Sequence, residues 1–328
     1  MTTVATAIRT VSRRHKADDA LLVRLCDLFS GNRTGNLGPD LYRNGGAEKF
    51  ENILSGAQAY TPFSGEIKLL NDNAEKIGQW IGSIETAIIV GPGPGKSVQQ
   101  KELTILSHMQ NLQRVITIEL SPVFNQQSAD VLRANLSGVT IHPFEMDFRD
   151  TDLSHIANSQ PALVISTGSL TNYEDCQPHS FPQGQVTKHI SKLAELAGSQ
   201  GKILWGYNSS LNAEQYNRPQ IDDFLMYPLV KASRMGDVRL DASGFRHETK
   251  ANTSASTLTH YWIATRDQDV EINGTCFAIN EGEHFPMFFS VAQSPERLER
   301  LIKSFPKISS FFYEKDGSGA VIHGFDCK

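Results

Sequence analysis

Closely spaced cysteines are absent from this sequence. It has four cysteines, Cys26, Cys176, Cys276 and Cys327, and they lie far apart. Disulfide frameworks and cysteine metal sites use cysteines in closer sets, so we expect reduced thiols and a cytoplasmic location. The ten histidines show no H-x-x-x-H or other paired spacing. The sequence therefore predicts no metal site.

Long apolar runs and an excess of basic charge are also missing. No apolar run approaches the roughly 20 residues that a membrane-spanning helix needs. Residues 1–16 lack the apolar segment of a secretory signal, and their basic residues fit either a transit peptide or an amphipathic helix start. With a net charge of −5, we expect neither nucleic acid nor a membrane as a partner.

What the sequence does contain is a strand that runs directly into a glycine-rich turn. Residues 86–90 are apolar or favour strands, and Gly91, Gly93 and Gly95 precede a segment that can form a helix. This arrangement presents backbone N–H groups to a nucleotide-like ligand. A phosphate loop (G-x-x-x-x-G-K-S) would need a glycine at position 90, where Val90 stands. The alternative is a structural turn without a ligand.

Acidic residues follow the next two predicted strands. Residues 114–120 form a strand that carries Glu119 near its end, and a carboxylate about 20 to 30 residues past the glycines can accept hydrogen bonds from both ribose hydroxyls. A third strand, over 139–144, leads to Asp147 and Phe148. These two can bind the adenine amino group and cover the base. The alternatives are a solvated acid for Glu119 and a turn residue for Asp147.

The fourth predicted strand, residues 161–167, has no acid at its end. It leads through Thr167 to Gly168 and Ser169, whereas a phosphate-loop enzyme needs an aspartate there to hold Mg²⁺. The sequence thus provides for ribose and adenine but not for a metal-bound triphosphate. An adenosine ligand without a phosphate chain remains, and S-adenosylmethionine fits that description.

Helical and strand-like segments alternate from about residue 61 to residue 206, which predicts a parallel, doubly wound α/β sheet. After residue 207 the pattern changes. There we expect a helix over 221–232 and an antiparallel pair formed by 260–265 and 270–279.

The C-terminal part returns to the α/β pattern. A capped helix over 294–305 and a hairpin around residues 316–319 close the chain, which is the usual ending of a class I methyltransferase. We expect two domains. The core comprises 61–206 and 285–328, and a smaller α+β substrate or lid domain comprises 1–60 and 207–284.

Five short segments resemble the motifs of one known family. They are LYR and GAEKF within 41–50 (family F-Y-D-x-x-G-S-x-L-F), YTPFSGE at 60–66 (Y-Y-P-T-R-x-E), ISTGSLTN at 165–172 (F-L-G-S-T-I-G-N), QYN at 215–217 (A-Y-D) and FPMFFS at 285–290 (T-E-x-S). Through them the chain resembles the histidine-specific Nα-methyltransferases. That family includes the enzyme that trimethylates histidine in ergothioneine biosynthesis and fungal indole-alkaloid N-methyltransferases.

The resemblance implies a Rossmann-like class I core, S-adenosylmethionine as cofactor and a small amine or amino acid as substrate. Asn172 and Tyr216 stand where the family holds the substrate carboxylate, and Tyr60 stands where a tyrosine lines the substrate pocket. Tyr42 takes the place of a tyrosine near the amine that is methylated. Ser290 matches the serine of the last motif.

Three positions depart from the family pattern. Phe288 stands where the histidine methyltransferase binds imidazole with a glutamate, and loss of such a charge-assisted hydrogen bond costs about 1.5–3 kcal/mol. Histidine is therefore not the expected substrate. An aromatic or apolar group is suggested instead by Phe288 and Phe289, with Tyr261 and Trp262. The alternative for Phe288 is a core position. Ile89 replaces an acid, and Lys96 lies one position from the lysine that contacts the cofactor carboxylate.

Methyl transfer from a sulfonium to an amine is an in-line displacement that depends mainly on positioning a neutral nitrogen. The Thr167 carbonyl, Ser169 and the Tyr42 hydroxyl can orient that amine, and a water or a tyrosine can take its proton. The sequence thus predicts an N-methyltransferase for an amino acid or small amine. The alternatives are O- or C-methylation of another small molecule, and a non-catalytic protein that binds S-adenosylmethionine or S-adenosylhomocysteine.

Overall fold

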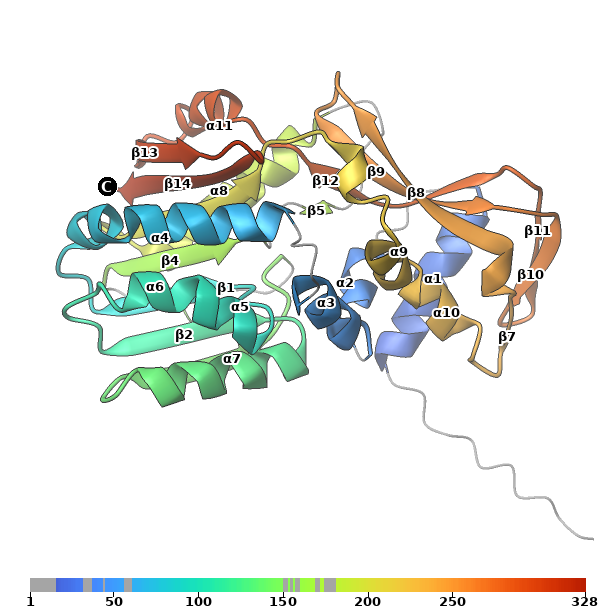
Figure 1. Ribbon diagram of the computed structural model, residues 1–328, viewed down its shortest axis with the longest axis horizontal. Coiled ribbons are helices and arrows are strands. Elements are labelled where there is room, and N and C mark those ends of the chain that lie inside the picture. Colours follow the sequence, from blue (N-terminus) through green and yellow to red (C-terminus); the bar gives the residue numbers. More distant parts are fainter. Residues whose placement is uncertain are drawn as a thin grey trace, which may run out of the picture.

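The fold is that of a computed structural model, which describes residues 16–31, 37–43, 45–55, 61–149, 153, 156, 160–168, 172–173 and 181–328. Figure 1 shows a sheet with helices on both faces and, beside it, a smaller lobe of helices and antiparallel strands. Within these ranges, none of the helices combines the length and the apolar character needed to cross a bilayer.

The larger body is built on a seven-stranded sheet with the order β13-β14-β6-β4-β1-β2-β3. Strands β1, β2, β3, β4 and β6 run parallel, and β14 is antiparallel to both of its neighbours. The bounds are β1 (Thr86–Val90), β2 (Arg114–Glu119), β3 (Thr140–Glu145), β4 (Ala162–Thr167), β6 (Lys202–Asn208), β13 (Ile308–Lys315) and β14 (Ala320–Cys327). The predicted α/β class and the closing hairpin are confirmed. The chain order reverses at β1, whose neighbours are β2 and β4, and ligands bind in the crevice at such a switch point.

Helices cover both faces of the sheet, because β1 is buried at every position and its last four residues are apolar. Ala87 and Ile89 pack toward one face, and Ile88 and Val90 pack toward the other. The first face carries α4 (Thr61–Ile81), α5 (Gly95–Gln100), α6 (Glu102–Leu106) and α7 (Pro122–Asn135); the second carries α8 (Gln183–Ala197) and α11 (Pro295–Ile302). A parallel sheet buried on both faces needs such continuous apolar strands.

The smaller lobe has its own apolar core, centred on fully buried side chains such as Trp262 and Phe285. Its four-stranded sheet has the order β5-β12-β9-β8, and a three-stranded sheet has the order β11-β10-β7. The strands are β5 (Asn172–Tyr173), β7 (Val238–Arg239), β8 (Phe245–Asn252), β9 (Thr257–Ala264), β10 (Gln268–Ile272), β11 (Thr275–Ile279) and β12 (His284–Val291). The helices are α1 (Lys16–Phe29), α2 (Gly38–Leu41), α3 (Gly46–Ser55), α9 (Pro219–Leu225) and α10 (Tyr227–Ala232), with short 3₁₀ turns at Ala213–Gln215 and Ala242–Gly244.

The predicted pairing of 260–265 with 270–279 is wrong. Strand β9 pairs with β8 and β12, whereas β10 and β11 form a hairpin with each other. The turn is Asn273-Gly274, and both residues have positive φ (51° and 79°). An Asn-Gly turn of this kind matches the twist of two adjacent strands, so the local hairpin forms. Strand β12 belongs to this lobe's sheet, although residues from 285 onward were assigned to the core.

Candidate functional site

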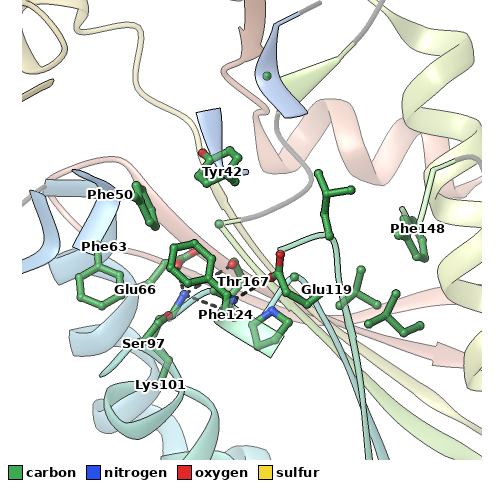
Figure 2. A pocket seen from close by; sticks show the side chains of 18 of the residues that line it. Tyr42, Phe50, Phe63, Glu66, Ser97, Lys101, Glu119, Phe124, Phe148 and Thr167 are labelled. Carbon is green, nitrogen blue, oxygen red and sulfur yellow. Dashed lines mark hydrogen bonds and ion pairs between the residues drawn. The ribbon is translucent and has the colours of Figure 1, made fainter. Parts of the chain in front are cut away.

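A cavity of about 200 Å³ lies at the carboxyl ends of β1, β2 and β4. Its floor is formed by the glycine-rich turn after β1 and by the ends of the neighbouring strands. Its other walls come from α2, α3, α4 and α7, and from Tyr216 of the smaller lobe. Figure 2 shows Lys101 toward the left and Glu119 toward the right of this space, with the aromatic rings of Tyr42 and Phe50 above them. The cavity therefore lies at the switch point of the sheet and between the two bodies.

The N–H groups of the glycine-rich turn donate to protein side chains, Glu119 among them, and are not all free to bind a ligand. Gly91 and Gly93 have φ values of 65° and 71°, which favour glycine. The Gly93 N–H donates to Glu119 Oε2 (3.1 Å), and the Gly95 N–H donates to Gln127 Oε1 (3.3 Å). A phosphate loop would direct such N–H groups at its ligand. The hydrogen bonds thus argue against the phosphate-loop interpretation.

Glu119 ends β2, lines the cavity and is 7% exposed. Its second oxygen, Oε1, accepts from the Ser121 N–H (2.8 Å). Burial raises the pKa of the Glu119 carboxyl, and the N–H groups of Ser121 and Gly93 partly oppose that shift. A carboxylate held in this way retains lone pairs for further donors, such as sugar hydroxyls.

Asp147 and Phe148 lie beyond the end of β3 and also line the cavity. Arg149 donates to Asp147 from its backbone N–H and from Nε (3.0 Å each), and from its terminal guanidinium nitrogen (2.7 Å). Burial alone would raise the pKa of Asp147, but the hydrogen bonds and charge of Arg149 hold it below its ordinary value. Asp147 is therefore an ionised acceptor, and Phe148 is a buried ring next to it.

A buried charged cluster lies on the opposite side of the cavity, and the sequence analysis missed it. Lys101 Nζ donates to Glu66 Oε2 (3.2 Å) and to Thr167 Oγ1 (2.9 Å). The Thr167 hydroxyl in turn donates to Glu102. Each of these four side chains is at most 5% exposed. Glu66, Lys101 and Thr167 line the cavity, and Gly206 leaves room for Glu66, because a Cβ at Gly206 would lie 2.5 Å from Glu66 Oε1.

Burial dominates the electrostatics of this cluster. It raises the pKa of Glu66 and of Glu102, and the nearby Lys101 lowers both. The Oε2 atom of Glu102 has no hydrogen-bond partner among the described residues. In the sequence, Glu66 of the 60–66 motif was the signal that pointed to this cluster. Lys101 and Glu102 resemble an ordinary charged pair on a helix and so gave no signal.

The other predicted residues that line the cavity are aromatic. Tyr42 packs edge-on against Phe50, with ring centroids 5.3 Å apart. Tyr216 is 8% exposed, and Asn208 Nδ2 donates to its hydroxyl at 3.4 Å. Lys96, by contrast, is exposed, does not line the cavity, and points its Nζ toward Ser55 Oγ (3.4 Å).

None of the residues of the last motif, 285–290, lines the cavity. Ser290 is opposite Asn172 in the ladder between β12 and β5. Phe288 lies on the same side of β12 as Ser290, is 4% exposed and stacks on His260 with ring centroids 4.3 Å apart. Phe288 does not line the cavity, and neither do Tyr261 and Trp262.

Two predicted residues, Tyr60 and Ser169, lie outside the described residues, and Asn172 is described only through its strand pairing. The structure thus brings together Gly91, Gly93, Glu119, Asp147, Phe148, Thr167, Tyr42 and Tyr216.

Comparison with known proteins identifies a family. A family model described as "Histidine-specific methyltransferase, SAM-dependent" matches residues 37–318. No curated protein matches the sequence.

Solved structures of similar fold have low sequence identity to this chain. Magnesium protoporphyrin IX methyltransferase from Synechocystis PCC 6803, with bound SAH, has a TM-score of 0.48 and 9% identity, over 89% of this chain and 99% of that chain. An S-adenosylmethionine-dependent methyltransferase from Clostridium acetobutylicum ATCC 824 has a TM-score of 0.45 and 9% identity, over 86% and 97%. An amino pentose methyltransferase from Micromonospora echinaspora has a TM-score of 0.41 and 12% identity, over 80% and 91%.

Proposed function

The chain belongs to the histidine-specific, S-adenosylmethionine-dependent methyltransferase family, and from this premise we propose that it methylates the amino group of an amino acid or small amine other than histidine. When bound, S-adenosylmethionine supplies an electrophilic methyl group on a sulfonium. The observation that carries the proposal is the register that sets Asn172 opposite Ser290. The family motifs that segments 165–172 and 285–290 resemble bind substrate at these two positions. The two positions lie far apart in the sequence.

Side chains at successive strand ends along the edge of the sheet suit the adenine, the ribose and the methionine end of this cofactor. We assign the adenine to Asp147 and Phe148 after β3, and the ribose hydroxyls to Glu119 at the end of β2. The methionine end of the cofactor carries one carboxylate and one ammonium. Lys101 and Glu66 offer the complementary charges next to the end of β4, beyond the glycine-rich turn. Lys96 remains an alternative partner for that carboxylate.

The opposite wall of the cavity is suited to hold an amine beside the methyl group. The rings of Tyr42, Phe50 and Tyr216 line it, and the Tyr42 hydroxyl can orient a nitrogen. Histidine is not the preferred substrate because Phe288, on the side of β12 that carries Ser290, has no carboxylate to bind an imidazole. An aromatic or apolar amine fits this composition better.

The division of the chain follows from these assignments. Residues 61–206 and 285–328, apart from strand β12, provide the cofactor side, and residues 1–60 and 207–284 shape the substrate side through Tyr42 and Tyr216. Strand β12 contributes to the substrate side because it pairs within the smaller lobe.

We also propose a cytoplasmic location and a small molecule as the only substrate partner. Three described cysteines, Cys26, Cys276 and Cys327, are free thiols, as in a reducing compartment. The net charge of −5 provides no basic excess for nucleic acid.

Calorimetric titration tests the function most directly. S-adenosylhomocysteine is titrated first, and then a panel of amino acids and aromatic amines is titrated into the same complex. We expect micromolar binding of S-adenosylhomocysteine, tighter binding of one panel member in its presence, and release of S-adenosylhomocysteine when that member is incubated with S-adenosylmethionine. Preference for histidine, or methylation on oxygen or carbon alone, would overturn the proposal.

Asn172→Ala is expected to lower kcat/KM by about 10- to 150-fold, because a hydrogen bond to a charged carboxylate contributes about 1.5–3 kcal/mol. The affinity for S-adenosylhomocysteine should stay unchanged. Steady-state kinetics and calorimetry measure the two effects separately. Asn135→Ala, which removes an exposed asparagine at the end of α7, is the control. A loss of cofactor affinity alone would contradict the assignment of Asn172 to the substrate.

A further inference from the structure

A line of four hydrogen bonds joins a surface carboxylate of the smaller lobe to Ser290. Asp222 Oδ1 lies 2.8 Å from His247 Nδ1, and His247 Nε2 lies 3.0 Å from Thr249 Oγ1. Thr249 Oγ1 also lies 2.9 Å from His260 Nδ1, and His260 Nε2 lies 3.3 Å from Ser290 Oγ. We call these five residues the relay. They come from α9, β8, β9 and β12, so only the tertiary structure brings them together.

The two ends of the relay lie in different surroundings. The Asp222 side chain is 43% exposed, whereas Thr249 and His260 are 3% and 1% exposed. At the inner end, Ser290 is opposite Asn172. The His260 ring also packs edge-on against Tyr216, a cavity-lining residue, with ring centroids 5.3 Å apart. The relay therefore connects Ser290, and through the His260 ring the cavity-lining Tyr216, to a half-exposed carboxylate.

The surroundings of both histidines of the relay favour the neutral ring. Burial lowers the pKa of His260 well below its ordinary value, and the neighbouring His247 lowers it further. Burial also lowers the pKa of His247, helped by Arg246 and opposed by Asp222 and Glu248. A neutral imidazole has one donor and one acceptor nitrogen, so each ring can pass one proton along the line.

The position of every proton follows from the carboxylate at the outer end. The Asp222 carboxylate can only accept a hydrogen bond. His247 therefore carries its proton on Nδ1, and its Nε2 is unprotonated. The Thr249 hydroxyl must then donate to His247 Nε2 and accept from His260 Nδ1–H. His260 Nε2 is consequently unprotonated and accepts a hydrogen bond from the Ser290 hydroxyl. All four donors thus point outward, toward Asp222.

We propose that the relay carries away the proton that the substrate ammonium loses before methyl transfer, an inference that rests on the proposed function. The N–H bond breaks, and a water passes that proton to Ser290 Oγ while the serine's own proton passes to His260 Nε2. The Nδ1 proton of His260 passes to Thr249 Oγ1, and the Thr249 proton passes to His247 Nε2. Finally, the Nδ1 proton of His247 passes to Asp222. The nitrogen keeps its electron pair for the methyl group, and Asp222 releases one proton to solvent.

The proton positions are tested without turnover. Long-range ¹H–¹⁵N NMR correlations distinguish the two neutral tautomers of histidine, and the variants His247→Gln and His260→Gln assign the signals. We expect both His247 and His260 to carry their protons on Nδ1. A proton on Nε2 of either ring would reverse part of the relay and overturn the inference.

The function of the relay is tested by pH–rate profiles of two variants. Asp222→Asn keeps an oxygen that accepts from His247 but is not a proton acceptor, and Thr249→Val removes the hydroxyl between the two rings. At pH 7 we expect each variant to lower kcat by about 10- to 100-fold with unchanged KM and unchanged S-adenosylhomocysteine affinity. The deficit should disappear as the pH approaches the pKa of the free amine, because the substrate then binds without the extra proton. Thr259→Val, a buried threonine of β9 outside the relay, should keep the wild-type profile.

The outcomes separate this inference from the proposed function. If the wild-type protein methylates an amine and Asp222→Asn has the same pH profile, the relay is overturned and the function stands. If the wild-type protein methylates no amine, the proposed function fails and the relay has no proton to carry. Because Asp222 lies at the surface, its variant keeps the test valid even if Thr249→Val does not fold.

Discussion

Replacing Lys101 with methionine is expected to lower the free energy of unfolding by about 3–5 kcal/mol at pH 7. The substitution keeps the apolar stem but removes the ammonium group that lies 3.2 Å from Glu66 and 3.9 Å from Glu102. Both carboxyls are at least 95% buried, so neither gains solvation when the cation is lost. A buried charge without its partner is far more costly than a missing surface ion pair.

The pH dependence of this loss has a definite sign. Burial raises the pKa of Glu66 and Glu102 above the ordinary value of 4.5, while the unfolded chain keeps that value. A carboxyl with a raised folded pKa favours folding most at low pH, and that contribution is lost as the pH rises through the raised pKa. Because Lys101 lowers both pKa values, its removal raises them further. The difference between Lys101→Met and the wild-type protein should therefore shrink as the pH falls from 7 toward 4.5.

Urea unfolding of both proteins at several pH values measures this effect. The matched control is Lys96→Met, which removes an exposed lysine from the neighbouring helix and should change the free energy of unfolding by less than about 0.5 kcal/mol. Equal effects of the two substitutions would show that the buried cluster does not depend on Lys101. Titration of S-adenosylhomocysteine into the same variants identifies which lysine the methionine end of the cofactor contacts.

Glu119→Ala is expected to weaken S-adenosylhomocysteine binding by about 1–3 kcal/mol, or about 5- to 150-fold. The substitution removes the acceptors of the ribose hydroxyls. It also frees the N–H groups of Gly93 and Ser121, which Glu119 now holds at 3.1 and 2.8 Å. The glycine-rich turn would lose the side chain that orients it. Calorimetry measures the loss of affinity.

Two further variants make the Glu119 prediction specific. Glu119→Gln keeps the size and one acceptor oxygen but loses the charge, so we expect a smaller loss than for alanine. Glu145→Ala removes the strand-end acid directly opposite Glu119 on β3, which is exposed and does not line the cavity. Its affinity should equal that of the wild-type protein. Unchanged affinity in Glu119→Ala would remove the ribose assignment.

Part of the site was predictable because its signals are local in the sequence. A continuous apolar strand followed by glycines predicts a buried strand and a turn, and Gly91 and Gly93 do adopt positive φ there. Acids at the ends of parallel strands meet at one edge of the sheet whatever the loops between them do. For that reason Glu119 and Asp147 were expected beside the same ligand, and both line the cavity.

The α/β class, the glycine-rich turn, the strand-end acids and, through five short motifs, the family could be predicted from the amino-acid sequence alone. Which distant polar groups meet became visible only in the folded protein. The fold brought Lys101 to Glu66, linked Asp222 to Ser290 through two histidines and a threonine, and placed Phe288 against His260 instead of in the cavity wall. The physical reason is that strand and helix periodicity depends on neighbouring residues. Pairing between buried polar side chains depends on packing among elements far apart in the chain, which no local pattern records.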